Sequence, residues 1–174
     1  MNVPMPARAS AALPRPLVVG IGDLAVSQSS GTLVTYALGS CLGITVYDPE
    51  SRVGALLHVM MPSSSISPEK AELNPYLFVD TGVPLMFRRC YKLGSDKRRM
   101  IVKVAGGAAP CTAGRDADYF QLGKRNMVQL RKLLWKNGVL LKSEDVGGTA
   151  SRTLTLALDS GAVSVKSGSR EAPL

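Results

Sequence analysis

The chain has 174 residues, of which 45% are hydrophobic and 20% are charged, and this composition is typical of one soluble globular domain. No apolar stretch approaches the roughly 20 residues of a membrane-spanning helix, so we expect no membrane insertion and a cytoplasmic location. The net charge of +8 favours an acidic partner. Only 5% of residues are aromatic and no common nucleic-acid-binding motif occurs, so we expect no nucleic-acid partner.

Both ends of the chain differ in composition from the middle. Residues 1–16 are rich in Ala and Pro and lack the apolar segment of a signal peptide, so we expect a disordered N-terminal tail. Residues 168–174 are polar and are predicted to form a C-terminal tail. No linker or repeat divides residues 17–167, which we expect to form one folded domain.

Strand patterns dominate the domain, with two helical stretches between them. A strand interrupted by glycines is expected over 18–26. Residues 32–61 are expected to form three strands, with a hairpin kinked sharply at Gly39–Ser40. The serine-rich segment 63–68 is predicted to be a loop. Helices are predicted over 77–92 and 121–137, and further strands over 100–104, 139–146, 153–158 and 162–166. This pattern indicates an α/β or α+β fold in which helices cover a sheet face.

The most informative feature is Cys41, which lies in the run Leu38-Gly39-Ser40-Cys41-Leu42-Gly43, followed in the next predicted strand by His58, the single histidine. A cysteine nucleophile needs a base or a pocket of backbone donors. His58 is the one side chain with an ordinary pKa near neutrality. If strand 53–61 pairs antiparallel with 41–47, His58 lies across from the Cys41 end. The alternative is that both residues simply fill the core.

The other cysteines suggest neither a metal site nor a disulfide framework. Cys41, Cys90 and Cys111 form no Cys-x-x-Cys pair, and one histidine does not complete a common zinc site. We therefore expect no metal and no cofactor, and an odd number of cysteines fits a reducing compartment.

The sequence around Cys41 resembles the active-site segment of the chemoreceptor glutamine deamidase family, CheD. The resemblance covers about residues 17–167 and rests on an ordered set of motifs. These are Thr35–Gly43 around the cysteine, Tyr47-Asp48-Pro49, Ala55–Pro62 around the histidine, Tyr76–Gly94, Lys103–Ala108, Leu122–Asn126, and Asp145–Gly148 with Arg152.

The resemblance implies a fold, an activity and a set of site residues. The fold would be a single-domain layered sandwich of mainly antiparallel sheet with two long helices. The activity would be that of a protein-glutamine glutaminase, an amidohydrolase that converts glutamine side chains of a chemoreceptor to glutamate and ammonia during bacterial chemotaxis adaptation. Cys41 would be the nucleophile and His58 the base, and Thr35 matches the family's third catalytic residue.

Backbone groups would complete this site. The oxyanion would be held by N–H groups around Gly39, Ser40 and Cys41, since such donors are common in acyl transfer. The pair Gly106 and Gly107 is a candidate for the border of the cleft, where backbone must approach substrate.

Basic residues are the candidates for partner docking. Lys97, Arg98 and Arg99 form one run, and Lys124 and Arg125 form another. The resemblance implies that the partner is the cytoplasmic helical bundle of a chemoreceptor. Docking on one face requires that the two runs converge in the fold.

Three other functions remain open. The chain could be a non-catalytic chemotaxis adaptor that binds and regulates a CheC-type phosphatase. It could be a redox-sensing thiol protein, with Cys90 or Cys111 resolving an oxidised Cys41. It could bind nucleic acid through its basic residues, which would give a steep salt dependence.

Overall fold

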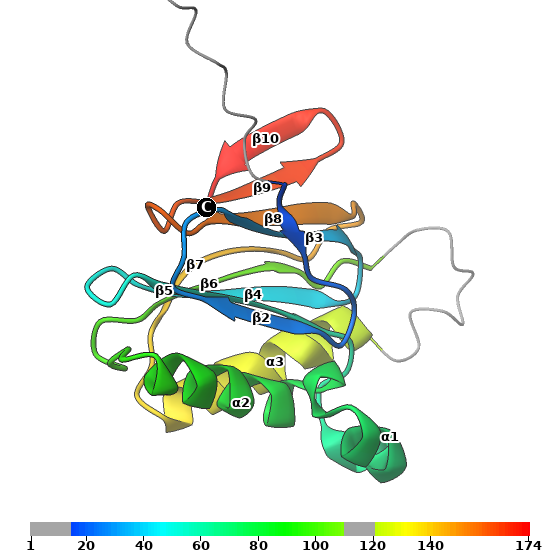
Figure 1. The fold of residues 1–174 in the computed structure, drawn as a ribbon. Helices are drawn as coiled ribbons and strands as arrows, with labels where there is room; N and C mark the ends of the chain where they lie inside the picture. Colours follow the sequence, from blue (N-terminus) through cyan, green and yellow to red (C-terminus); the bar gives the residue numbers. More distant parts are fainter. Residues whose placement is uncertain (1–14, 110–120) are drawn as a thin grey trace, which may run out of the picture.

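Two β-sheets lie face to face, and helices cover the outer face of one of them (Figure 1). The computed structural model describes residues 15–109 and 121–174, and the following account is limited to them. This architecture confirms the predicted α+β fold of layered, mainly antiparallel sheet with two long helices. We call the sheet that the helices cover the central sheet, because it lies between the helices and the second sheet. The second sheet, which no helix covers among the described residues, is called the outer sheet.

Each sheet has five strands, and both combine segments from distant parts of the chain. The outer sheet has the order β1-β3-β8-β9-β10, with β1 Leu17–Val18, β3 Thr32–Leu38, β8 Arg152–Ala157, β9 Val163–Ser167 and β10 Arg170–Pro173. The central sheet has the order β2-β5-β4-β6-β7, with β2 Leu24–Ser27, β5 Val53–Val59, β4 Leu42–Asp48, β6 Ile101–Gly106 and β7 Leu141–Val146. Among the strands within residues 15–109 and 121–174, only the pairs β1–β3 and β6–β7 are parallel.

Strands β4 and β5 are buried on both faces along their whole length. Their sequences are therefore continuous apolar runs, because neither face meets water. One face packs against the helices through residues such as Ile44, Leu57 and Val59. The opposite face, with Tyr47 and Leu56, packs against the outer sheet.

Two long helices form the third layer. Helix α2 spans Val79–Lys92 and α3 spans Leu122–Lys136. The predicted apolar face of α3 is confirmed, since Met127, Leu130 and Leu134 are buried. Short elements precede α2, namely the 3₁₀ turns η1 (Ser64–Ile66) and η2 (Pro75–Leu77) and the helix α1 (Pro68–Leu73). The predicted loop 63–68 thus contains η1 and the first residue of α1.

The predicted kinked hairpin over 32–61 is wrong in its first half. Strand β3 belongs to the outer sheet and β4 to the central sheet, so the chain changes sheets at Gly39–Ser40 instead of turning back within one sheet. The second half is a true hairpin, because β4 and β5 pair antiparallel. A kink predicted from glycine shows that the chain bends, but it does not show which partner the next strand finds.

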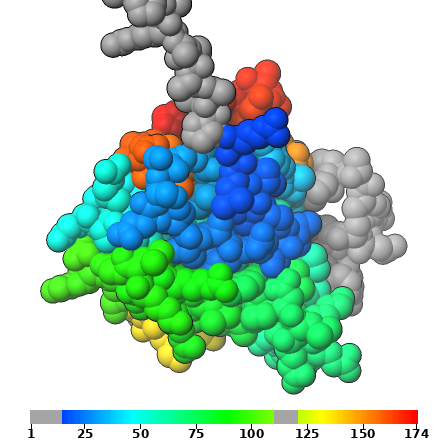
Figure 2. Space-filling view, in the orientation of Figure 1, coloured from blue at the N-terminus to red at the C-terminus, as the bar shows by residue number. Residues whose placement is uncertain are grey.

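The ends of the domain also differ from the prediction. Residues 18–26 divide between β1 and β2, which lie in different sheets. In the space-filling view this segment (blue) runs over the side of the molecule between β10 (red) and α2 (green) (Figure 2). The polar C-terminal tail is wrong for Arg170–Pro173, which form β10 and pair antiparallel with β9. Strand β10 is an edge strand and therefore needs no apolar pattern. Residues 1–14 of the predicted N-terminal tail lie outside the described residues.

Candidate active site

Cys41 lies where the chain passes from the outer sheet to the central sheet. Strand β3 ends at Leu38 and β4 begins at Leu42, so the passage consists of Gly39, Ser40 and Cys41. The Cys41 side chain packs between the two sheets and is 9% exposed. Cys41 is thus enclosed by both sheets, but a small part of it remains exposed to solvent.

His58 lies on the strand next to Cys41 and on the same face of the central sheet. In the antiparallel pairing of β4 with β5, His58 is opposite Gly43. Because side chains alternate along a strand, Cys41 projects to the same side as Gly43. Cys41 and His58 are thus diagonal neighbours, whose Cβ atoms are typically about 7 Å apart, within reach of long side chains. This arrangement confirms the predicted antiparallel pairing.

Thr35 is hydrogen-bonded to the imidazole of His58. The Thr35 hydroxyl donates to the Val19 carbonyl at 2.7 Å, and its oxygen lies 2.8 Å from His58 Nδ1. A hydroxyl has one proton, so Thr35 accepts the second hydrogen bond and Nδ1 carries the proton. Nε2 is then the basic nitrogen. It is buried and has no hydrogen-bond partner among the described residues.

Residues 19–23, which connect β1 to β2, form hydrogen bonds with both Thr35 and His58. Val19 supplies the carbonyl that takes the Thr35 proton. The N–H of Gly22 donates to the His58 carbonyl at 2.8 Å, and the N–H of His58 donates to the Asp23 carbonyl at 3.1 Å. Sequence reasoning missed this support, because backbone groups leave no residue-type signal.

A bulge in β3 directly after Thr35 returns Leu38 to the inner face that Thr35 already occupies. The pairing of β3 with β8 shifts between Thr35 and Leu38, and Ala37 between them has a φ of 56°. Thr35 and Leu38 would face opposite sides of a regular strand, but here both are buried while Tyr36 and Ala37 are exposed. β-Bulges commonly redirect a side chain in this way.

Gly43 leaves space for the side chains of three neighbours, Leu38, Leu154 and Thr35. A Cβ at this position would lie 2.8 Å from Leu38 Cδ1, 2.9 Å from Leu154 Cδ2 and 3.2 Å from Thr35 Cγ2. A larger residue would therefore crowd the Leu38 and Leu154 side chains and press on Thr35. A glycine within an apolar strand is the sequence signal that could have identified this close approach.

Burial keeps both titratable groups of the site neutral at physiological pH. It lowers the pKa of His58 to about 4, because a charged imidazole is poorly solvated there. Burial also raises the pKa of the Cys41 thiol, an effect only partly offset by its own backbone N–H. At rest the site therefore holds a neutral thiol and a neutral imidazole on the same face of the central sheet.

The pKa of His58 predicts a pH dependence of stability. Unfolded His58 binds a proton below about pH 6.5, whereas folded His58 does so only below about pH 4. The contribution of His58 to the free energy of unfolding is therefore fully present above pH 6.5. As the pH falls from 6.5 to 4, up to about 3 kcal/mol of it is lost. We expect the free energy of unfolding of wild type to fall more steeply in this window than that of His58→Asn. Because the chain has one histidine, parallel curves for the two proteins would contradict the burial of a neutral imidazole.

The backbone around Cys41 presents free donors. The carbonyls of Gly39, Ser40 and Cys41 accept hydrogen bonds from Ala108 N–H, Asn126 Nδ2 and Gly107 N–H, at 2.8, 3.0 and 2.8 Å. The N–H groups of Ser40 and Cys41 donate to no other residue within the described segments. Of the predicted oxyanion donors, the Gly39 N–H donates to the Ala37 carbonyl at 2.9 Å and is not available, so the prediction is wrong for Gly39; those of Ser40 and Cys41 remain candidates. Gly106 has a different role from the one predicted, because a Cβ there would collide with the Cys41 carbonyl oxygen.

A cleft of about 400 Å³ opens beside this backbone, within the usual range for ligand sites. Ser40, Gly107, Gln121 and Lys124 are among its lining residues. Ser40 directly precedes Cys41, so the cleft reaches the segment that carries Cys41. Gly107, a candidate for the border of a substrate cleft, is also among the lining residues.

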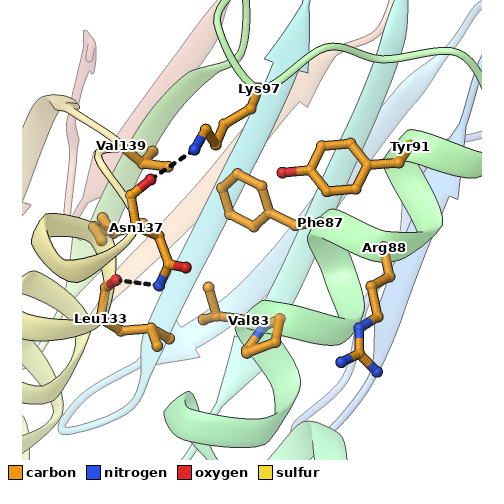
Figure 3. A pocket seen from close by; sticks show the side chains of 10 residues that line it. Val83, Phe87, Arg88, Tyr91, Lys97, Leu133, Asn137 and Val139 are labelled. Carbon is orange, nitrogen blue, oxygen red and sulfur yellow. Dashed lines mark hydrogen bonds between the residues drawn. The ribbon is translucent and has the colours of Figure 1, made fainter.

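The predicted docking residues do not form one surface. Lys97 Nζ donates to the carbonyl of Asn137 at 2.9 Å, in the groove between α2 and the end of α3 (Figure 3). Lys124 and Arg125 lie in the first turn of α3. Asn137 lies 13 positions after Lys124 along α3 and its C-terminal cap, a rise of roughly 20 Å. Only Lys124 and Arg125 are near the cleft.

Arg98 and Arg99 are paired within the chain. Arg98 binds the Asp96 carboxylate at 2.7 Å. Arg99 binds Asp48, which is fully buried, at 2.8 Å, and Glu50 at 3.0 Å. Burial alone would raise the pKa of Asp48, but the Arg99 guanidinium and backbone N–H groups hold it well below its usual range. Arg99 therefore stabilises the fold and is not free for a partner.

Other groups add little to the chemistry of the site. Cys90 is fully buried in α2, on the helix side of the central sheet, away from Cys41. Cys111 lies outside the described residues. Within residues 15–109 and 121–174, no three His, Cys, Asp or Glu side chains gather to hold a metal ion. No helix in the same ranges has the length and apolar character that crossing a bilayer requires.

Comparison with known proteins identifies the family. A family model described as CheD chemotactic sensory transduction matches residues 60–167. A protein of Syntrophus aciditrophicus named "Probable chemoreceptor glutamine deamidase CheD 1" is 48% identical over 152 residues, 87% of this chain and 93% of the relative. Similarly named proteins of Solibacter usitatus and Pyrococcus abyssi are 44% and 40% identical, over 83% and 87% of this chain and 85% and 91% of each relative. The chain belongs to the CheD family.

Proposed function

We propose that this chain is a chemoreceptor glutamine deamidase, which hydrolyses glutamine side chains of a receptor's cytoplasmic helical bundle to glutamate and ammonia. The names of its relatives support this activity. The observation that carries the mechanism is the hydrogen bond between Thr35 and His58 Nδ1, which leaves a buried, basic Nε2 on the face that bears Cys41.

The first half of the reaction forms a thioester. As the Cys41 sulfur attacks the carboxamide carbon, His58 Nε2 takes the thiol proton. The carbonyl oxygen becomes an oxyanion, which the N–H groups of Ser40 and Cys41 receive. His58 then returns the proton to the departing nitrogen, the C–N bond breaks and ammonia leaves.

The second half regenerates the thiol. A water molecule gives a proton to His58 Nε2 as its oxygen attacks the thioester carbon. The C–S bond breaks, the proton returns to sulfur, and the product is the glutamate side chain. The net reaction consumes one water and requires no cofactor, because acid–base catalysis by one histidine serves both steps.

Thr35→Val tests the orienting role of the hydroxyl. Valine has nearly the same shape but leaves the His58 Nδ1–H and the Val19 carbonyl without their partner. We expect kcat for ammonia release to fall about 10- to 100-fold, because the imidazole loses its orientation and tautomer. Thr35→Ser keeps the hydroxyl and is the matched control, expected to retain most activity. Equal kcat values for the two variants would leave Thr35 with no part in the reaction.

Lys124 and Arg125 are the residues we propose for docking the receptor, since Lys124 lines the cleft and Arg125 lines the adjoining hollow that also includes Lys124. Charge reversal of both to Glu should raise KM about 10-fold at low salt and change kcat little, because rim charges act mainly through association. Lys97→Glu, at the far end of α3, is the control. A double variant with unchanged KM would show that the receptor docks elsewhere.

An ammonia-release assay on a receptor cytoplasmic fragment separates the deamidase from the alternative adaptor. A deamidase releases ammonia in proportion to its concentration and time. An adaptor for a CheC-type phosphatase would bind the fragment or the phosphatase without releasing ammonia. Absence of release from wild type, with binding retained, would favour the adaptor.

A further inference from the structure

Asn126 joins the segment that carries Cys41 to the strand that carries His58. It lies on α3 and is fully buried. Its Nδ2 donates one hydrogen bond to the Ser40 carbonyl and another to the Met60 carbonyl, both at 3.0 Å. Ser40 immediately precedes Cys41, and Met60 follows His58 by two residues. One amide group therefore fixes the backbone beside both reacting residues.

The bond to Ser40 determines where the Cys41 N–H points. The peptide between them is planar and trans, and in a trans peptide the C=O and N–H point in opposite directions. The Ser40 carbonyl is directed at Asn126 in the helix layer. The Cys41 N–H is therefore directed away from α3, and it donates to no other residue in the described ranges.

The cost of the arrangement indicates that it is retained for a reason other than packing. Both protons of the Asn126 amide are used, but its Oδ1 is buried and has no partner in the described part of the chain. A buried acceptor left unpaired is unfavourable. The neighbouring buried positions on this face of α3, Met127 and Leu130, are apolar.

We propose that Asn126 is a positioning residue for deamidation, which holds the Cys41 N–H in the direction required to receive the oxyanion. The inference rests on the proposed function. Asn126 does not touch the substrate. It acts through the Ser40–Cys41 peptide, and through Met60 it keeps that peptide in register with His58.

Two reactions of Cys41 separate this role from a merely structural one. Deamidation develops an oxyanion, whereas alkylation by iodoacetamide is a direct displacement at carbon and develops none. In Asn126→Ala we expect kcat for ammonia release to fall about 10- to 100-fold, somewhat less than for deletion of an oxyanion donor, with KM within about 3-fold. The alkylation rate and its pH profile should stay within about 3-fold of wild type.

Two further variants complete the experiment. Asn126→Leu fills the space of the amide without donating hydrogen bonds, and should behave as Asn126→Ala does. Asn137→Ala removes another asparagine amide, the one that donates to Leu133 at the far end of α3, and should match wild type.

The possible outcomes are distinguishable. If wild type releases ammonia and the Asn126 variants have the same kcat, the inference about Asn126 is overturned but the proposed function stands. A parallel loss of deamidation and alkylation, or the loss of the thermal unfolding transition in both variants, also overturns it in favour of a structural role. A wild-type protein that releases no ammonia overturns the proposed function, and this inference with it.

Discussion

Cys41→Ser should abolish ammonia release, with a loss in kcat of about 10⁴-fold or more, as expected for removal of a nucleophile. The substitution replaces sulfur with a smaller atom in the same place between the sheets, so the fold should be preserved. A serine hydroxyl is far less acidic than a thiol, and His58, with a pKa of about 4, is too weak a base to activate it.

The matched control for this variant is Cys90→Ala. Cys90 is also buried, but it packs among apolar residues on the helix side of the central sheet. Its loss should leave kcat within about 2-fold of wild type, because surface and core changes away from the site act mainly on stability. Full activity in Cys41→Ser, or inactivity in Cys90→Ala, would show that Cys41 is not the thiol that carries out the reaction.

His58→Asn should lower kcat by about 10²-fold or more, the usual contribution of a general acid–base group. Asparagine retains a hydrogen-bonding group near Thr35 but does not carry a proton from sulfur to nitrogen. Ammonia release measured under saturating receptor fragment gives this effect directly. A variant within a few-fold of wild type would make His58 a structural residue.

The pH profile of wild type gives an independent test of the same residue. Because burial lowers the pKa of His58 to about 4, its basic form is already present at pH 5.5. We therefore expect kcat/KM to be nearly constant from about pH 5.5 to 8 and to fall as the pH drops through about 4. An acid limb near pH 6.5, the ordinary value for histidine, would show that the imidazole is solvated in the free enzyme.

The pairing of Cys41 with His58 could be predicted from the sequence because it depends on local features. Strand parity and one antiparallel hairpin place both residues on one face. The change of sheet at Gly39 could not be predicted in the same way. Strands β4 and β5 are buried on both faces, so their apolar runs are the same whether β3 lies beside them or above them.

Residues that act through distant contacts were harder to predict. The partner of Arg99 is Asp48, and nothing in the basic run 97–99 shows that one of its charges is used inside the protein. Asn126 did leave a signal. It lies four residues before Leu130 on the buried stripe of α3, and a polar residue at such a position calls for a hydrogen-bonding explanation.

The most direct test of the central claim is mass spectrometry of a receptor cytoplasmic fragment incubated with wild type or with Cys41→Ser. We expect wild type to convert particular glutamines to glutamate, seen as the mass gain of deamidation at those sites, and Cys41→Ser to leave the same peptides unchanged. Unmodified glutamines after incubation with folded wild type, or equal conversion by both proteins, would contradict the account.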